Sequence, residues 1–115
     1  MRYMLLICRD EKVELDPEAR ARIPAAAEAW AKEMDGRGVR VEGNALAAIS
    51  ASKAVRVRDG QVLITDGPFA ETKEQIGGFD ILDCADLDEA LEVASKHPVA
   101  TFGTVEVRPF WGPDA

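Results

Sequence analysis

The chain has 115 residues, of which 47% are hydrophobic and 30% charged, with a formal net charge of −7 at pH 7. This length and composition predict a single domain spanning residues 1–115, with enough apolar side chains for a core. The acidic balance argues against binding of nucleic acid or of an anionic membrane, because both depend on Lys and Arg. The cysteines Cys8 and Cys84 match no disulfide framework or zinc spacing, and two such thiols fit a reducing cytosol. We expect a cytoplasmic protein with no metal and no cofactor.

The N-terminal third predicts a strand followed by a helix. Residues 2–8 are apolar at both alternating positions, which is typical of a central strand. The apolar run is too short for a secretory signal or a membrane span. Asp16-Pro17-Glu18 has the residues of a helix start. Pro24 predicts a kink or a restart in that helix, whose apolar face is formed by Ile23, Ala26, Ala27, Trp30 and Met34.

The rest of the chain predicts five more strands and one helix. Residues 39–42 alternate like a strand, and residues 43–52 either extend it or form a loop. Asp59-Gly60 joins two alternating runs and predicts a hairpin. Strands are expected at residues 79–84 and 103–110. Between them, Asp86 and Glu89 resemble a capping box, before a buried stripe of Leu87, Ala90, Leu91 and Ala94.

Without the hairpin this order is β-α-β-β-α-β, which predicts an α+β, ferredoxin-like antiparallel sheet with an inserted hairpin. Both helices would cover one face of the sheet. The other face then requires a cover of its own, and we expect a second copy of the chain to supply it.

Strand alternation predicts which side chains lie on that second face. We assume that the residues packed against the helices are Val39, Val41, Phe79, Ile81, Val105 and Val107. The opposite face then carries Arg40, Glu42, Asp80, Leu82, Glu106 and Arg108. Carboxylates enclosed there would have raised pKa values suited to acid–base chemistry, so its five charged residues are candidate ligand-binding groups. The alternative is a solvated or interfacial face with ordinary ion pairs.

The most constrained stretch lies between two predicted strands, at residues 65–79. Gly67 can adopt positive φ without a steric cost, and Pro68 disfavours the right-handed helical region for it. Because Pro68 has no N–H, the Asp66 carboxylate lacks its usual turn partner and is a candidate base or ligand anchor. Phe69 and Lys73 are candidate ligand contacts in a loop that closes on a ligand. The alternative is turn chemistry followed by one solvated helical turn.

The single histidine, His97, is a candidate general acid or base, because its ordinary pKa lies near neutrality. The alternative is a structural role at the end of a helix, before Pro98. A basic cluster of Lys53, Arg56 and Arg58 could bind an anion, or it could form a charged strand edge.

Residues 66–74, Asp-Gly-Pro-Phe-Ala-Glu-Thr-Lys-Glu, resemble the signature of the YCII-related family, in its DGPF-motif branch. The resemblance continues at residues 1–6, 76–79, 86–90 and 105–110. It implies a ferredoxin-like domain that dimerises face to face as a dimeric α+β barrel. It implies no settled activity. Some YCII-related proteins have a His–Asp dyad with the His in the first helix, but residues 23–28 contain no His.

Two functions follow from these observations. The first is a small-molecule binder or weak acid–base enzyme, with its site between the two sheets of a homodimer. The alternative is a non-catalytic regulatory or interaction protein, because the resemblance to the DGPF branch implies a link to sigma-factor-dependent transcription initiation. Whether the protein is an enzyme is left open by the sequence.

Overall fold

A computed structural model describes residues 1–69 and 73–112 of the chain. Six strands, two helices and two short 3₁₀ turns follow one another. They are β1 (Arg2–Arg9), α1 (Pro17–Gly36), β2 (Arg40–Ala45), η1 (Ile49–Ala51), β3 (Lys53–Arg58), β4 (Gln61–Asp66), β5 (Gln75–Asp83), α2 (Leu87–Ser95), η2 (Pro98–Thr101) and β6 (Thr104–Pro109). Within the described ranges, neither helix has the length and apolarity that crossing a membrane requires.

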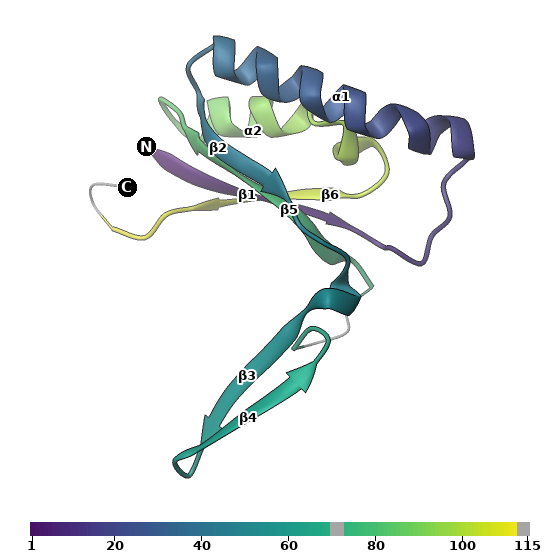
Figure 1. The fold of residues 1–115 in the computed structure, drawn as a ribbon. Helices are drawn as coiled ribbons and strands as arrows, with labels where there is room; N and C mark the ends of the chain where they lie inside the picture. The colour runs from purple at the N-terminus through teal and green to yellow at the C-terminus, as the bar shows by residue number, and fades with distance from the viewer. Residues whose placement is uncertain (70–72, 113–115) are drawn as a thin grey trace.

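The fold consists of one antiparallel sheet with both helices on one face (Figure 1). The strand order is β2-β5-β1-β6, and β3 and β4 form a separate two-stranded sheet. With the hairpin set aside, a β-α-β-β-α-β chain in this order is ferredoxin-like, so the predicted fold class is confirmed. We call the sheet face away from the helices the open face. It carries Met4, Leu6, Cys8, Glu42, Asn44, Phe79, Ile81, Thr104, Glu106 and Arg108.

Helix α1 begins where its sequence predicts. The Asp16 carboxylate accepts a hydrogen bond from the Ala19 N–H at 3.3 Å, and Pro17 occupies the first turn. The helix continues through Pro24 as one element, so the restart expected there does not occur. Pro24 and Arg20, one turn earlier, are both exposed, and water can replace the hydrogen bond that the proline removes. Trp30 and Met34 are the buried residues of this helix.

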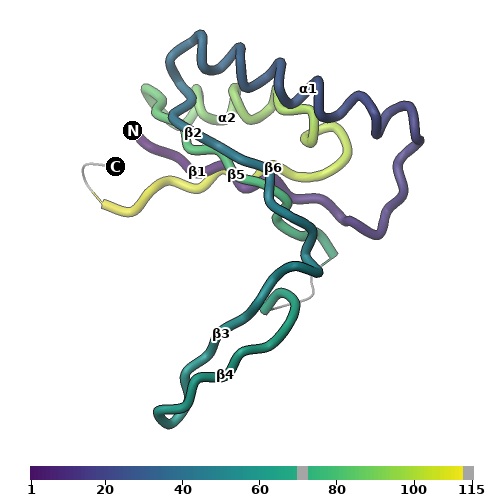
Figure 2. The backbone as a smooth tube through the Cα atoms, viewed as in Figure 1, coloured from purple at the N-terminus to yellow at the C-terminus, as the bar shows by residue number. Residues whose placement is uncertain are grey.

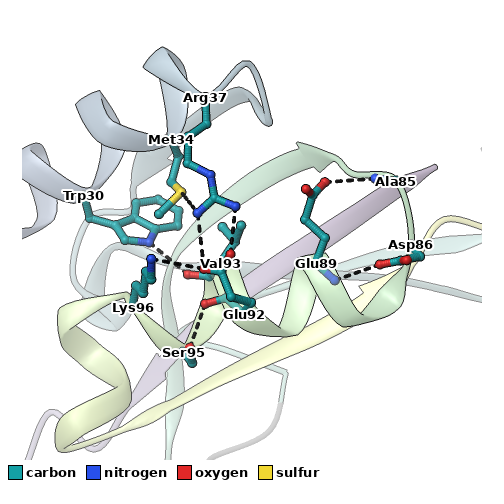
Figure 3. A network of polar contacts seen from close by, with 10 residues as sticks. All are labelled: Trp30, Met34, Arg37, Ala85, Asp86, Glu89, Glu92, Val93, Ser95 and Lys96. Carbon is teal, nitrogen blue, oxygen red and sulfur yellow. Dashed lines mark hydrogen bonds and ion pairs between the residues drawn. The ribbon is translucent and has the colours of Figure 1, made fainter.

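Polar contacts from α1 side chains connect the two helices (Figure 3). The Trp30 indole N–H donates to the Val93 carbonyl at 3.0 Å. The Arg37 guanidinium binds the Glu92 carboxylate through two hydrogen bonds of 2.8 and 3.2 Å. The indole bond is buried while the Arg37 pair is largely exposed, so the tryptophan contact is the stronger constraint on the helix pair.

The start of α2 resembles the predicted capping box. The Asp86 carboxylate accepts a hydrogen bond from the Glu89 N–H at 2.9 Å. The Glu89 carboxylate in turn accepts from the N–H of Ala85, one residue before the cap, at 2.9 Å. Together these contacts satisfy two N–H groups at the helix start, as Figure 3 shows.

The predicted buried stripe of α2 was wrong in part. Ala90 and Ala94 are buried as expected, but Leu87 and Leu91 are 46% and 47% exposed. Val93 takes their place in the core and is fully buried. The helix therefore packs through its smaller side chains, which permits the close approach that the bond from Trp30 to Val93 requires.

The phase of β5 also differs from the prediction. Tyr3 and Leu5 are buried in the core, and they lie opposite Leu82 and Asp80 in the ladder. Asp80 and Leu82 therefore face the helices, while Phe79 and Ile81 lie on the open face. The prediction failed because residues 79–82 offer large apolar side chains at both alternating positions.

The neighbouring strands follow the prediction more closely. Val105 and Val107 pack against the core, and Val39 is buried. Val41 was expected there too but is 48% exposed. A register shift between Arg40 and Glu42 takes Val41 out of the alternation of β2.

The predicted hairpin is present, with Asp59 and Gly60 at φ 51° and 76° in its turn. It extends away from the sheet on the side opposite the helices, as the ribbon and the tube both show (Figures 1 and 2). Gly67, after β4, has φ 90°, a backbone conformation that glycine adopts without a steric cost.

We predict that Leu82→Ala lowers the free energy of unfolding by about 2–5 kcal/mol, because Leu82 is fully buried on the helix side. Leu87→Ala is the matched control and should cost within about 0.5 kcal/mol, because Leu87 is exposed. Urea unfolding of both variants measures the difference. Equal losses of unfolding free energy in Leu82→Ala and Leu87→Ala would contradict the observed phase of β5.

Candidate functional site

A cleft of about 620 Å³ opens between residues 20–31 of α1, the sheet and η2. Its apolar wall includes Ile7, Ile23, Trp30, Val99 and Phe102. The charged residues on its lining are Arg9, Arg20, Glu28, Arg40 and Asp80. The cleft therefore combines a small apolar surface with a few polar groups, which is the usual make-up of a small-molecule site.

The deepest charged group in the cleft is Asp80, which is 6% exposed. Its Oδ1 accepts a hydrogen bond from Arg40 Nε at 2.8 Å. The same guanidinium binds the Asp35 carboxylate at 3.2 and 3.4 Å and donates to the Gly43 carbonyl at 3.3 Å. Arg40 is thus held by three partners, and it fixes one oxygen of Asp80.

The local backbone of β2 makes this contact possible. The register shift places Arg40 opposite Leu82 and Gly43 opposite Asp80, so both β2 residues face the helices. A Cβ at Gly43 would lie 2.6 Å from Asp80 Cγ and 2.7 Å from the Phe79 carbonyl oxygen. Only glycine leaves room for the carboxylate there, so Gly43 belongs to the site although it contributes no side chain.

The electrostatics of Asp80 suit proton transfer. Burial raises the pKa of the Asp80 carboxyl above its ordinary value, and the hydrogen bond from Arg40 opposes that rise without cancelling it. Among residues 1–69 and 73–112, hydrogen bonds reach only the Oδ1 atom of Asp80. The Oδ2 atom of Asp80 therefore accepts no hydrogen bond from these residues.

His97 lines the same cleft and is 5% exposed. Its Nδ1 accepts a hydrogen bond from the Val99 N–H at 3.1 Å, so the ring proton is assigned to Nε2. The imidazole meets Trp30 edge to face, with ring centroids 4.7 Å apart. Burial lowers the pKa of His97 to about 4, so the ring is neutral at pH 7.

The structure brings together three of the predicted site residues, which are Arg40, Asp80 and His97. The expectation that Arg40 and Asp80 share a face with Glu106 and Arg108 was wrong. Glu106 and Arg108 lie on the open face, where they form an ion pair with each other, and Glu42 is on that face as well. The cause is the phase of β5, which turns Asp80 toward the helices.

The predicted residues of the signature stretch do not line the cleft, although the hollow that Lys73 lines shares Arg9 and Phe102 with it. Asp66 forms an ion pair with Lys53 across the base of the hairpin, so its carboxylate is not left without a partner. Phe69 is 75% exposed, and the Arg56 guanidinium lies 4.8 Å from its ring centroid. Lys73 lines a second hollow of about 760 Å³, together with Asp10, Val13 and Leu15. Residues 70–72 of the signature lie outside the described residues.

Burial raises the pKa of Cys84 to about 11 and also raises that of Cys8, so both remain thiols at neutral pH. Within the part of the chain that the structure describes, no three His, Cys, Asp or Glu residues are grouped to hold a metal ion.

Comparison with known proteins places this architecture in a family. The model of the YCII-related domain matches residues 1–112. The chain belongs to the YCII-related family. An uncharacterised protein of Rhizobium meliloti (strain 1021) is 41% identical over 98 residues, covering 70% of this chain and 79% of that protein.

A solved structure has the same fold as this YCII-related chain. It is the 5-chloro-2-hydroxyhydroquinone dehydrochlorinase of Burkholderia phenoliruptrix AC1100, in complex with 2,5-dihydroxybenzoquinone. The TM-score is 0.55 at 14% identity, and the match covers 99% of this chain and 97% of that chain. At this identity the likeness concerns the fold alone.

Sequence reasoning missed several residues of the cleft in this YCII-related protein, including Arg9 and Arg20, and two further ones shape its wall. Trp30 was assigned to the core, although its ring also supports His97 at the cleft wall. Gly43 was read as part of an irregular segment. Its signal would have been a glycine three residues after Arg40 in a strand, a position where a backbone often approaches another group closely.

We predict that Gly43→Ala costs about 1–3 kcal/mol of stability, because the added methyl group collides with Asp80 and forces the ion pair with Arg40 apart. Gly36→Ala is the control. A Cβ at Gly36, in the last turn of α1, meets no atom within 4 Å, and the change should stabilise the helix by about 0.5–1 kcal/mol. Chemical unfolding measures the change in stability of both variants. A Gly43→Ala variant with unchanged stability would refute the close contact between position 43 and Asp80.

A second prediction concerns the pH dependence of stability. The unfolded His97 imidazole protonates near pH 6.5, while the folded one does so near pH 4. Between these pH values the unfolded state binds more protons than the folded state. The contribution of His97 to the free energy of unfolding is therefore greatest above pH 6.5, and it falls as the pH falls toward 4. By pH 4.5 the loss should reach about 2–3 kcal/mol.

His97→Gln removes this titration, so its free energy of unfolding should fall less than that of the wild type between pH 7.5 and 4.5. Urea unfolding at half-unit intervals measures both curves. Parallel curves would show that the imidazole is solvated in the folded state.

Proposed function

We propose that this YCII-related protein binds a small, flat organic acid in the cleft and transfers a proton to or from it. The observation that carries the proposal is Asp80. Its carboxylate is buried, has a raised pKa, and has one oxygen bound to Arg40 and the other left for a ligand. A general base positioned in this way is suited to proton abstraction near neutral pH.

The lining of the cleft supports the choice of ligand class. Trp30, His97 and Phe102 provide aromatic surface, which suits a ring. Arg9 and Arg20 also line the cleft, and neither forms an ion pair within the described residues. Two such guanidinium groups favour an anionic or acidic ligand over a cationic one.

The comparison with the dehydrochlorinase is consistent with this class. That enzyme was solved with a dihydroxylated quinone ring, on the same fold. A hydroxylated ring of that size is small enough for a cleft of about 620 Å³. The fold thus accommodates a small cyclic acid in another protein, and the residues of the present cleft have the chemistry to bind one.

The proposed proton transfer assigns one role to each residue. Asp80 Oδ2 takes a proton from the bound molecule, and the electron pair of the broken bond moves onto a ligand oxygen. The Nε2–H of neutral His97 donates a hydrogen bond to that oxygen as its negative charge develops. Arg40 is a positioning residue, because its contacts with Asp35 and Gly43 hold Asp80 in one orientation. The proton leaves Asp80 for the product or for water.

We place the site in the cleft and not between two sheets, because Arg40 and Asp80 lie on the helix side. We also propose that the open face joins two copies into a homodimer. Its central side chains, Met4, Leu6, Phe79 and Ile81, form an apolar surface that no element of the described chain covers. The cleft and this interface would then lie on opposite faces of the same sheet.

Two further parts of the sequence interpretation remain proposals. Membership of the DGPF-motif branch is supported by residues 66–74, and a cytoplasmic location by the two free thiols. For the regulatory alternative, with its link to sigma factors, we find no supporting observation in the cleft or in the comparisons. The small-molecule function is therefore the one we propose.

The test is ligand binding to Asp80→Asn. Titration calorimetry against a panel of hydroxylated benzoic acids, hydroquinones and hydroxyquinones should give a binder with the wild type. Asp80→Asn keeps the size of the side chain but removes the base. It should abolish proton exchange at the ligand and change affinity at least tenfold.

Glu106→Gln is the matched control, because it removes one carboxylate from the open face. Its binding should stay within twofold of the wild type. If Glu106→Gln loses binding while Asp80→Asn retains it, the site lies between the sheets and the cleft proposal fails. If no panel compound binds the wild type, the proposed ligand class fails.

A further inference from the structure

The β3–β4 hairpin exposes one continuous apolar side. In its register Val55 lies opposite Ile64, and Val57 lies opposite Val62, so these four side chains share one side of the two-stranded sheet. They are between 59% and 65% exposed. We call these four residues the apolar strip. Four β-branched side chains at neighbouring cross-strand positions normally pack against other apolar side chains.

The other side of the hairpin already has partners. Leu63, opposite Arg56, is 44% exposed, less than any residue of the strip. The Arg56 guanidinium lies over the Phe69 ring. A two-stranded hairpin is marginally stable alone in water, so a hairpin held only by this side would be weakly ordered. The apolar strip is therefore the surface that requires a cover.

The size of the exposed surface agrees with a missing partner. A folded chain of 12.5 kDa has about 6,200 Å² of accessible surface. This chain has 7980 Å², an excess of about 1,800 Å². Its radius of gyration is 16.1 Å, compared with about 13 Å for a compact chain of similar length. A stable dimer covers about 800 Å² on each partner, so the excess is large enough to supply such an interface.

Geometry and area favour a second copy as the partner. The hairpin extends on the side of the sheet where the open face lies (Figure 1). The open face offers the apolar side chains of Met4, Leu6, Phe79 and Ile81. Each copy thus has both an apolar arm and an apolar face, which is the surface that a self-complementary dimer would bury.

We propose that the apolar strip of each copy packs on the open face of a second copy, so that two hairpins are exchanged in a two-fold dimer. Such an interface is self-complementary, because each chain gives one arm and receives one. This goes beyond a dimer in which only the two sheets meet. It is independent of the small-molecule function, because the cleft lies on the opposite face of the sheet.

The test compares two neighbouring residues on opposite sides of the hairpin. Val62→Asp puts a charge into the apolar strip, and Leu63→Asp puts the same charge on the other side. By sedimentation velocity between 1 and 100 μM, the wild type and Leu63→Asp should be dimers. Val62→Asp should be a folded monomer at 10 μM, with dimer affinity lowered at least 100-fold. A monomeric wild type, or a Val62→Asp dimer of unchanged affinity, overturns the proposal.

A mixing experiment separates arm exchange from general damage. Ile81→Asp places the charge on the receiving face and should also give a monomer. An equal mixture of Val62→Asp and Ile81→Asp should form heterodimers, because the intact arm of one variant meets the intact face of the other. Circular dichroism of each variant alone checks that it is folded. Two folded variants that stay monomeric when mixed would contradict the reciprocal interface.

Discussion

The contact between Arg40 and Asp80 determines how the central sheet presents its two faces. Because Arg40 holds Asp80 on the helix side, strand alternation places Phe79 and Ile81 on the open face. The same register thus produces a buried carboxylate in the cleft and an apolar surface without a cover. A chain with the opposite phase would bury Phe79 and expose Asp80, and it would have neither feature.

The ion pair between Arg40 and Asp80 explains two local features of β2, its register shift and its glycine. A regular β2 strand would place residues three apart on opposite faces, but the register shift near Val41 brings Arg40 and Gly43 to the same one. The missing side chain of Gly43 then makes room for the carboxylate. The register shift, Gly43 and the ion pair depend on one another, so a change in any of them should disturb the others.

The sequence predicted the topology because turn and cap residues are local signals. Asp59-Gly60, Asp16-Pro17 and Asp86 each occupy the position that their chemistry favours. The phase of β5 was not predictable, since residues 79–82 satisfy either face and the choice depends on Arg40, which is distant in sequence. His97 was weighed as a helix-end residue, and its burial against Trp30 depends on packing between α1 and η2 that no local pattern encodes.

A buried ion pair is weak evidence for stability, because desolvating two charges costs several kcal/mol, and well-packed apolar residues are often as stable. Selection for folding alone would therefore favour an apolar pair at positions 40 and 80. The chain instead keeps a carboxylate there and holds one of its oxygens with a guanidinium that has two further partners. It also keeps a neutral imidazole among the residues of the same cleft. The fold alone does not require these two polar groups, whereas the proposed proton transfer on a bound molecule requires both.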